Sequence, residues 1–128
     1  MLSSRPILVA VPIEWSSQVC EHLKQHGFPV IATHSQEETL AMASKPEDLR
    51  GMIIVSDWAM STENNENSNI IKLVKGKIPT VTLITETSRQ QSGYRYMEEI
   101  FFPPSHDYAT VPFDLDELTV RMQHVGMI

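Results

Sequence analysis

The chain has 128 residues, 41% hydrophobic and 20% charged, which is typical of one globular domain. Its net charge of −6 argues against binding nucleic acid or an anionic membrane through a basic surface. The single cysteine, Cys20, excludes an internal disulfide, and no apolar run approaches the roughly 18 residues of a membrane helix. We therefore expect a single cytoplasmic domain over residues 1–128, without membrane or direct nucleic-acid contact.

The first predicted elements are a strand, a helix and a second strand. Residues 7–11 form an uninterrupted apolar run, which is typical of a strand buried on both faces. From Trp15 onward, apolar residues recur every four positions, which predicts a helix that ends at Gly27. Residues 28–32 are the second predicted strand.

A second helix and a third strand follow. Ser35 and Glu38 have the spacing of a capping box, in which each side chain accepts a hydrogen bond from the backbone amide of the other residue. The helix that they begin is predicted to end by Pro46. Residues 52–55 are the third apolar strand, and the polar stretch 61–68 after it is predicted to be a loop.

The remaining elements are two strands and three helices. A short helix around Ile70 precedes the fourth strand, residues 79–85, and a helix over residues 91–102 precedes the fifth, residues 108–111. A capping box at Asp114 begins the last helix. Five strand–helix units with buried strands indicate an α/β fold, a doubly wound parallel sheet in the order 2-1-3-4-5 with helices on both faces.

Asp57 is the sharpest candidate for a functional residue, because it directly follows the third strand. In doubly wound folds, ligands bind at the carboxyl ends of the strands. A carboxylate there can act as a nucleophile, a metal ligand or a cap. The spacing alone leaves a capping role as open as a functional one.

Two stretches resemble the signatures of response-regulator receiver domains, especially the chemotaxis regulator. The run Ile-Ile-Val-Ser-Asp-Trp-Ala-Met, ending at Met60, resembles their third-strand signature. The run Asp-Tyr-Ala-Thr-Val-Pro-Phe-Asp, ending at Asp114, resembles their fifth-strand signature. The resemblance covers essentially the whole chain and implies a flavodoxin-like receiver fold with five strand–helix units. It also implies phosphoryl transfer from a histidine kinase to an Asp, with a magnesium ion.

Part of the family's set of site residues carries over to this chain. Asp57 matches the phospho-acceptor, Tyr108 matches the switch aromatic of strand five, and Pro112 matches the proline after it. Thr85 is the best match for the hydroxyl that bonds the phosphoryl group, although strict spacing would place Ile84 there.

Three charged residues of the family are missing. Val11 and Pro12 stand where the family has two acids, and Glu14 comes two residues late. Val111 stands in the place of the lysine that neutralises the phosphoryl charge. Magnesium prefers about six oxygen ligands and usually needs carboxylate charge, which these residues do not supply.

The resemblance and its losses together predict a degenerate pseudo-receiver. At best, Asp57 and the Ala59 carbonyl form a weak magnesium site, so we expect no resident metal or other cofactor. The predicted function is a phosphorylation-independent protein-interaction module in two-component signalling, not an enzyme. The alternative is a working receiver that a histidine kinase phosphorylates on Asp57.

A candidate interface lies near strand five. Aromatic residues concentrate there and stand beside an arginine, as interface anchors do: Tyr94, Tyr96, Phe102 and Tyr108. Core packing is an equally open interpretation of these aromatics. The resemblance favours an interface, because receivers commonly dimerise or dock through helix four, strand five and helix five. The expected partner is a histidine kinase, an output domain or a second copy.

His22 and His26 lie four residues apart on the first predicted helix, a spacing that can hold a metal ion. No third ligand is evident beside them. Ordinary surface positions are therefore the expected role of both residues.

Overall fold

The computed structural model describes residues 5–59, 70, 77–85, 106–110 and 113–128. Within these ranges, five parallel strands form one sheet in the order β2-β1-β3-β4-β5, which confirms the predicted order. The strands are β1 Ile7–Ala10, β2 Val30–Thr33, β3 Gly51–Val55, β4 Thr80–Ile84 and β5 His106–Thr110.

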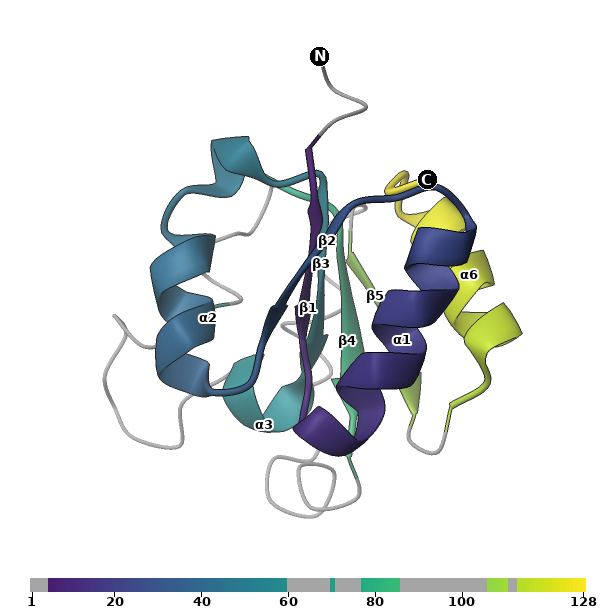
Figure 1. Cartoon of the computed structure of the whole chain (residues 1–128), viewed down its shortest axis with the longest axis horizontal. Coiled ribbons are helices and arrows are strands. Elements are labelled where there is room, and N and C mark those ends of the chain that lie inside the picture. Colours follow the sequence, from purple (N-terminus) through teal and green to yellow (C-terminus); the bar gives the residue numbers. More distant parts are fainter. Residues whose placement is uncertain (1–4, 60–69, 71–76, 86–105, 111–112) are drawn as a thin grey trace.

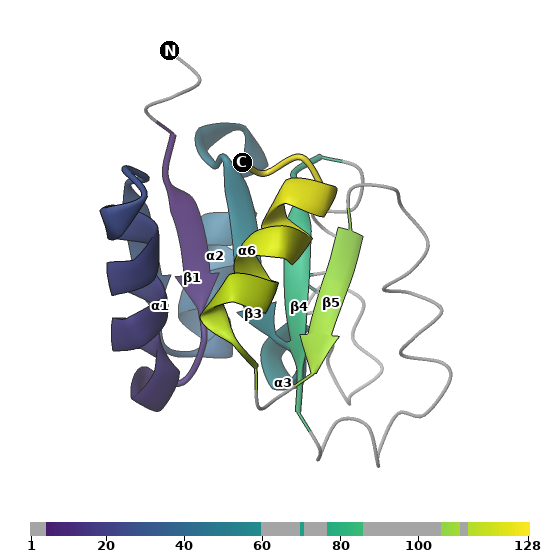
Figure 2. The same ribbon diagram turned by 90° about the vertical axis from the view of Figure 1, so that its right-hand side faces the viewer.

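The described helices cover both faces of this sheet. They are α1 Ile13–Gln25, α2 Gln36–Ala43, the 3-10 helix η2 Pro46–Asp48, α3 Ser56–Ala59 and α6 Leu115–His124. In Figure 1, α1 and α6 lie on one side of the sheet and α2 and α3 on the other. Figure 2, turned toward the first side, shows α6 in front of the strands and α1 to the left of β1, with α2 fainter behind the sheet. The doubly wound fold is therefore confirmed. None of the helices in these ranges is long and apolar enough to span a membrane.

β1 and β3 are buried on both faces, which explains their continuous apolar sequences. Successive side chains of a strand point to opposite faces of the sheet. Accordingly, Ile7 and Val9 join the core under α1 and α6, with Leu118 and Met122 of α6. Leu8 and Ala10 join the core on the other face, with Ala43 of α2. One short strand thus serves two cores.

The second predicted strand was placed two residues too early. The Phe28 amide donates to the Leu23 carbonyl at 3.1 Å and the Gly27 amide donates to the Lys24 carbonyl at 3.0 Å. Gly27 has φ of +84°, so these bonds form the glycine-dependent closure of a helix end. Phe28 belongs to that closure, and β2 begins only at Val30.

The fifth predicted strand was placed two residues too late. His106 pairs with Thr80, and Asp107 pairs with Val81 of β4. Asp107 is buried within the strand rather than exposed in a turn.

Both predicted capping boxes form only in part. The Glu38 amide donates to Ser35 Oγ at 3.1 Å, as predicted. The Glu38 carboxylate, however, accepts from the His34 amide and the Ser35 hydroxyl, each at 3.3 Å, rather than from the Ser35 amide. At α6, Asp114 Oδ1 accepts from the Asp116 amide at 2.8 Å, two residues on instead of three. Each side chain still satisfies one free amide at a helix start.

Candidate functional site

The residues that follow β1, β3 and β4 meet at one edge of the sheet, here called the carboxyl edge: Val11, Pro12, Ser56, Asp57 and Thr85. These three strands are neighbours, and Val55 at the end of β3 pairs with Leu83 of β4. α3 begins directly after β3, and Asp57 is its second residue. The backbone therefore places Asp57 at the end of the sheet where doubly wound folds bind ligands.

Thr85 contacts Ser56, the residue that follows β3. Its backbone amide donates to Ser56 Oγ at 3.0 Å, and the two hydroxyl oxygens lie 3.4 Å apart. Ser56 is buried and Thr85 is half-buried. Ile84, the alternative position for the hydroxyl, is the last residue of β4 and is also buried. The Thr85 hydroxyl therefore lies beside the Ser56 hydroxyl at the carboxyl edge.

The segment after β1 brings no carboxylate into the buried part of this edge. Val11 is fully buried and belongs to the core under α1 and α6. Pro12 precedes the first turn of α1, and its carbonyl accepts from the Trp15 and Ser16 amides. Glu14 lies in that first turn and is exposed. The structure therefore places an apolar side chain and a helix start where the receiver family has two acids.

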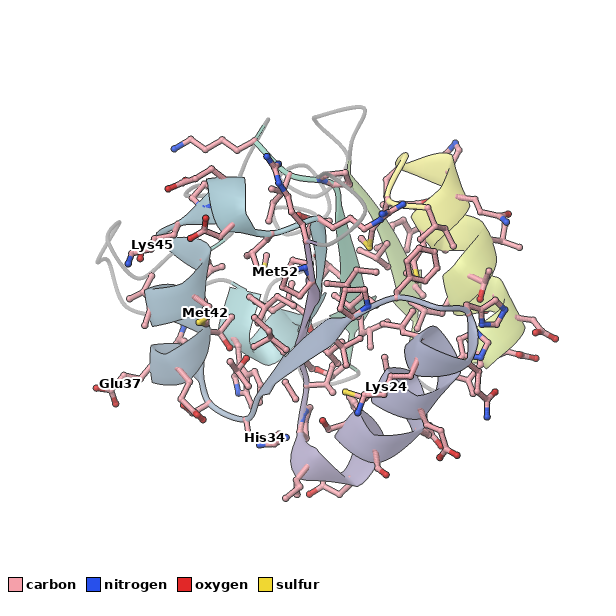
Figure 3. The ribbon with its side chains drawn as sticks, turned by 45° about the horizontal axis from the view of Figure 1, so that its top comes forward. Lys24, His34, Glu37, Met42, Lys45 and Met52 are labelled. Atoms are coloured by element: carbon pink, nitrogen blue, oxygen red, sulfur yellow. The ribbon has the colours of Figure 1, made fainter. Side chains whose placement is uncertain are left out.

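His34 adds a polar contact at the same end of the sheet. Figure 3 shows His34 beyond the carboxyl end of β2, on the side where α1 begins. Its Nε2 lies 3.1 Å from Ser16 Oγ, and Ser16 is buried. A buried hydroxyl is poorly placed to act as a nucleophile on a bound substrate. We interpret this pair as a contact that joins β2 to α1.

The other predicted site residues have mixed outcomes. Pro112, Tyr94, Tyr96 and Phe102 lie outside the described residues, and so does Val111. Ala59 ends α3. Tyr108 lies in β5 and is half-buried. Among the described side chains, no three of the His, Cys, Asp and Glu type gather as a metal-binding group.

A cluster around Asp107 was missed by the sequence reasoning. The Asp107 side chain is only 6% exposed, and its Oδ2 accepts from His124 Nδ1 at 2.9 Å. Arg121 Nη1 lies 3.4 Å from the same oxygen. Asp107 Oδ1 accepts from the Tyr108 amide at 2.7 Å. The Asp107 carboxylate in β5 therefore binds the side chains of two α6 residues, Arg121 and His124.

Two opposing effects set the pKa of Asp107. Burial favours the neutral acid and by itself would raise the pKa. The hydrogen bonds from His124 and from the Tyr108 amide, together with the Arg121 charge, favour the carboxylate. The pKa of Asp107 consequently lies below its usual value. The cluster lies toward the amino end of β5, away from the carboxyl edge, because Asp107 pairs with Val81 near the start of β4.

Solved structures share this architecture over nearly the whole chain. A response regulator receiver protein from Sinorhizobium medicae WSM419 has a TM-score of 0.71 and 14% identity, covering 98% of this chain and 96% of that one. The receiver domain of the Francisella response regulator 1452 has a TM-score of 0.66 and 15% identity, covering 94% of this chain and 95% of that one. This chain has the receiver-domain fold.

The receiver fold also occurs in proteins with other names. An adenylate cyclase from Rhodopirellula baltica matches with a TM-score of 0.63 and 15% identity, covering 98% of this chain and 89% of that one. No protein-family model matches the sequence, and no curated protein matches it. At these identities the likeness establishes the fold, and any function must be argued from the residues at the site.

Proposed function

We propose that this chain is an atypical receiver domain, a module of two-component-type signal transduction that binds a protein partner without phosphorylation and has no catalytic activity of its own. The receiver fold supports the class of module. The observation that carries the loss of phosphorylation is Val11, fully buried in the core where an acidic residue would hold magnesium. We place this activity in the cytoplasm, where two-component partners act.

Whether Asp57 can be phosphorylated depends on the residues at the carboxyl edge, because of the chemistry of phosphoryl transfer. Transfer depends on positioning and on cations that neutralise the charge of the transferred group. Magnesium binds through carboxylates and oxygen ligands in a tight octahedron. At the carboxyl edge, the described residues offer an apolar Val11, the ring of Pro12 and the hydroxyls of Ser56 and Thr85. Loss of one such electrostatic element commonly slows a reaction by about 100- to 1000-fold.

A working receiver is the second candidate function. Asp57 is the second residue after β3, Thr85 directly follows β4, and the two strands are neighbours. A hydroxyl and a carboxylate at adjacent strand ends are two of the parts that the resemblance requires. In this alternative, a histidine kinase phosphorylates Asp57 with little help from a metal ion.

Incubation with acetyl phosphate and magnesium, followed by intact mass measurement, separates the two candidates. We expect no phosphoryl adduct on the parent chain. An adduct that is absent from Asp57→Asn would support the working receiver instead. The variant Val11→Asp, Pro12→Asp, Val111→Lys restores two carboxylates and a cation, so we expect it to gain labelling. If the folded variant stays unlabelled, the edge differs from a working receiver in more than these three side chains.

The proposed partner is a histidine kinase, an output domain or a second copy of the chain. We propose that it binds through β5, α6 and the predicted helix over residues 91–102, the part of the sequence that contains Tyr94, Tyr96, Phe102 and Tyr108. A Tyr94→Ala, Phe102→Ala variant should lose association in sedimentation while its thermal midpoint stays within a few degrees. A buried Phe removed from a core would instead cost roughly 3–5 kcal/mol of stability. A large drop in midpoint with unchanged association would mean that these aromatics are core residues.

A further inference from the structure

Two histidine rings lie close together at the end of α1. His22 and His26 are one helical turn apart, and their ring centroids are 4.6 Å apart with the planes tilted by 54°. His26 is exposed and His22 is half-buried against α6. Figure 1 shows α1 and α6 on the same side of the sheet. The hydrogen bonds around the two rings decide which nitrogen of each is available to a ligand.

The first ring is oriented by a hydroxyl of α6. His22 Nε2 lies 2.7 Å from Thr119 Oγ1, and the Thr119 hydroxyl donates its own hydrogen to the Leu115 carbonyl at 3.1 Å. A hydroxyl has a single hydrogen, so the arrangement that keeps both bonds is the one in which Thr119 donates to Leu115 and accepts from His22. Nε2 of His22 therefore carries the hydrogen, and in the uncharged ring the lone pair is on Nδ1.

The second ring is oriented by the backbone of α1. His26 Nδ1 lies 2.9 Å from the His22 carbonyl oxygen. A carbonyl only accepts hydrogen bonds, so Nδ1 of His26 must carry the hydrogen. In the uncharged ring the lone pair is then on Nε2. Each imidazole thus keeps one nitrogen for a ligand while its other nitrogen is held by a hydrogen bond.

We propose that His22 Nδ1 and His26 Nε2 together bind one divalent transition-metal ion, such as nickel, copper or zinc. Imidazole nitrogen suits these metals, whereas magnesium and calcium prefer oxygen. Metal-bound histidines characteristically donate their second ring nitrogen to a carbonyl or another acceptor, and both rings here already do so. Because the described part of the chain adds no third ligand of the His, Cys, Asp or Glu type, water completes the coordination. The ion is therefore exchangeable and exposed.

This site is separate from the carboxyl edge and does not depend on the proposed signalling function. His22 and His26 lie in the last turn of α1 and just after it, whereas the carboxyl edge adjoins the first turn of that helix. A bound ion would sit beside the contact between α1 and α6. It would restrain the end of α1 without touching Asp57.

Calorimetric titration of the full chain with nickel chloride tests the proposal, and a zinc chloride titration repeats it. We expect one ion per chain. We also expect His26→Ala to weaken nickel binding by more than about tenfold, because the variant removes a ligand. Loss of a residue that only supports a ligand already weakens metal affinity by about 10- to 100-fold. His26 is exposed, so this variant should keep the parent's thermal midpoint. His34→Ala is the matched control, since it removes another exposed histidine and should bind nickel as the parent does.

A second variant tests the orientation of the ring. Thr119→Val keeps both histidines but removes the acceptor that holds His22 Nε2. We expect a loss of about tenfold in nickel affinity. Three results would overturn the proposal: no binding by the parent, binding by His26→Ala that matches the parent, or an equal loss in His34→Ala.

Discussion

Replacement of Asp107 by Asn should destabilise the protein, although the two side chains have nearly the same shape. The carboxylate accepts hydrogen bonds from His124, from the Tyr108 amide and from Arg121 on its two oxygens. An Asn side chain has one oxygen and one NH₂ group. Whichever way it turns, its NH₂ group meets a donor that the carboxylate satisfied. The variant therefore buries a donor opposite a donor, and it loses the charge that holds Arg121.

The size of this loss follows from the exposure of the partners. A hydrogen bond to a charged group contributes about 1.5–3 kcal/mol, and a buried unsatisfied donor costs about 1–3 kcal/mol. His124 is 75% exposed and Arg121 is 38% exposed, so water recovers part of what they lose. We expect Asp107→Asn to lower the free energy of unfolding by about 1–2 kcal/mol at pH 7.

Urea unfolding at several pH values measures this effect. Asp107 has a lowered pKa in the folded state, so its contribution is complete above its unfolded pKa of about 4 and disappears as the pH falls through the folded value. The difference between parent and variant should therefore shrink below about pH 4. Glu117→Gln is the control, because its pair with Arg121 at 3.7 Å is exposed and is worth only about 0.5 kcal/mol or less. Equal stability of parent and Asp107→Asn at pH 7 would refute the reasoning, as would a difference that stays constant into acid.

Three further predictions concern other parts of the fold. Gly51→Ala places a Cβ 2.5–2.9 Å from the buried Met127 side chain, so we expect a loss of about 1–3 kcal/mol in urea unfolding. An unchanged midpoint would show that Met127 moves aside freely. Ser56→Ala removes the acceptor of the Thr85 amide, so we expect faster hydrogen exchange at that amide and a loss of about 1 kcal/mol. Unaltered exchange would mean that the amide finds another acceptor. Low-millimolar magnesium should leave Trp58 fluorescence without a saturable change, because the carboxyl edge supplies too little carboxylate charge. Saturation below about 1 mM would reveal a magnesium site there.

The sheet could be predicted from the sequence because two of its central strands, β1 and β3, are unbroken apolar runs. β1 and β3 are buried along their whole lengths, and no polar residue interrupts their apolar sequences. The ends of β2 and β5 were missed for different physical reasons. At β2, an apolar Phe28 closes the preceding helix instead of joining the strand. At β5, a charged Asp107 is buried because partners far along the chain satisfy it.

The candidate site residues were predicted from the end of a strand and from the receiver resemblance. Asp57 was proposed because it follows an apolar run, which is a local feature, and Thr85 because it matches the hydroxyl of the resemblance. The Asp107 cluster needed a longer argument. Asp107 and Ala109 are two residues apart on β5 and so point to the same face of the sheet. Arg121 and His124 are three residues apart on α6 and so lie on the same side of the helix. Together the strand spacing and the helix spacing could have indicated a carboxylate covered by a helix, although neither spacing shows which helix covers the strand.

The Asp107 cluster also gives α6 a mechanical role. On one side α6 is fastened to the edge strand β5 through Asp107, and on the other it is fastened to α1 through Thr119 and His22. Packed elements of this kind move as rigid bodies between discrete arrangements rather than bending gradually. A displacement of β5 would therefore either break one of these two attachments or pull α1 with it. Because α6 connects α1 to β5, restraining α1 would also restrain the edge of the sheet that β5 forms.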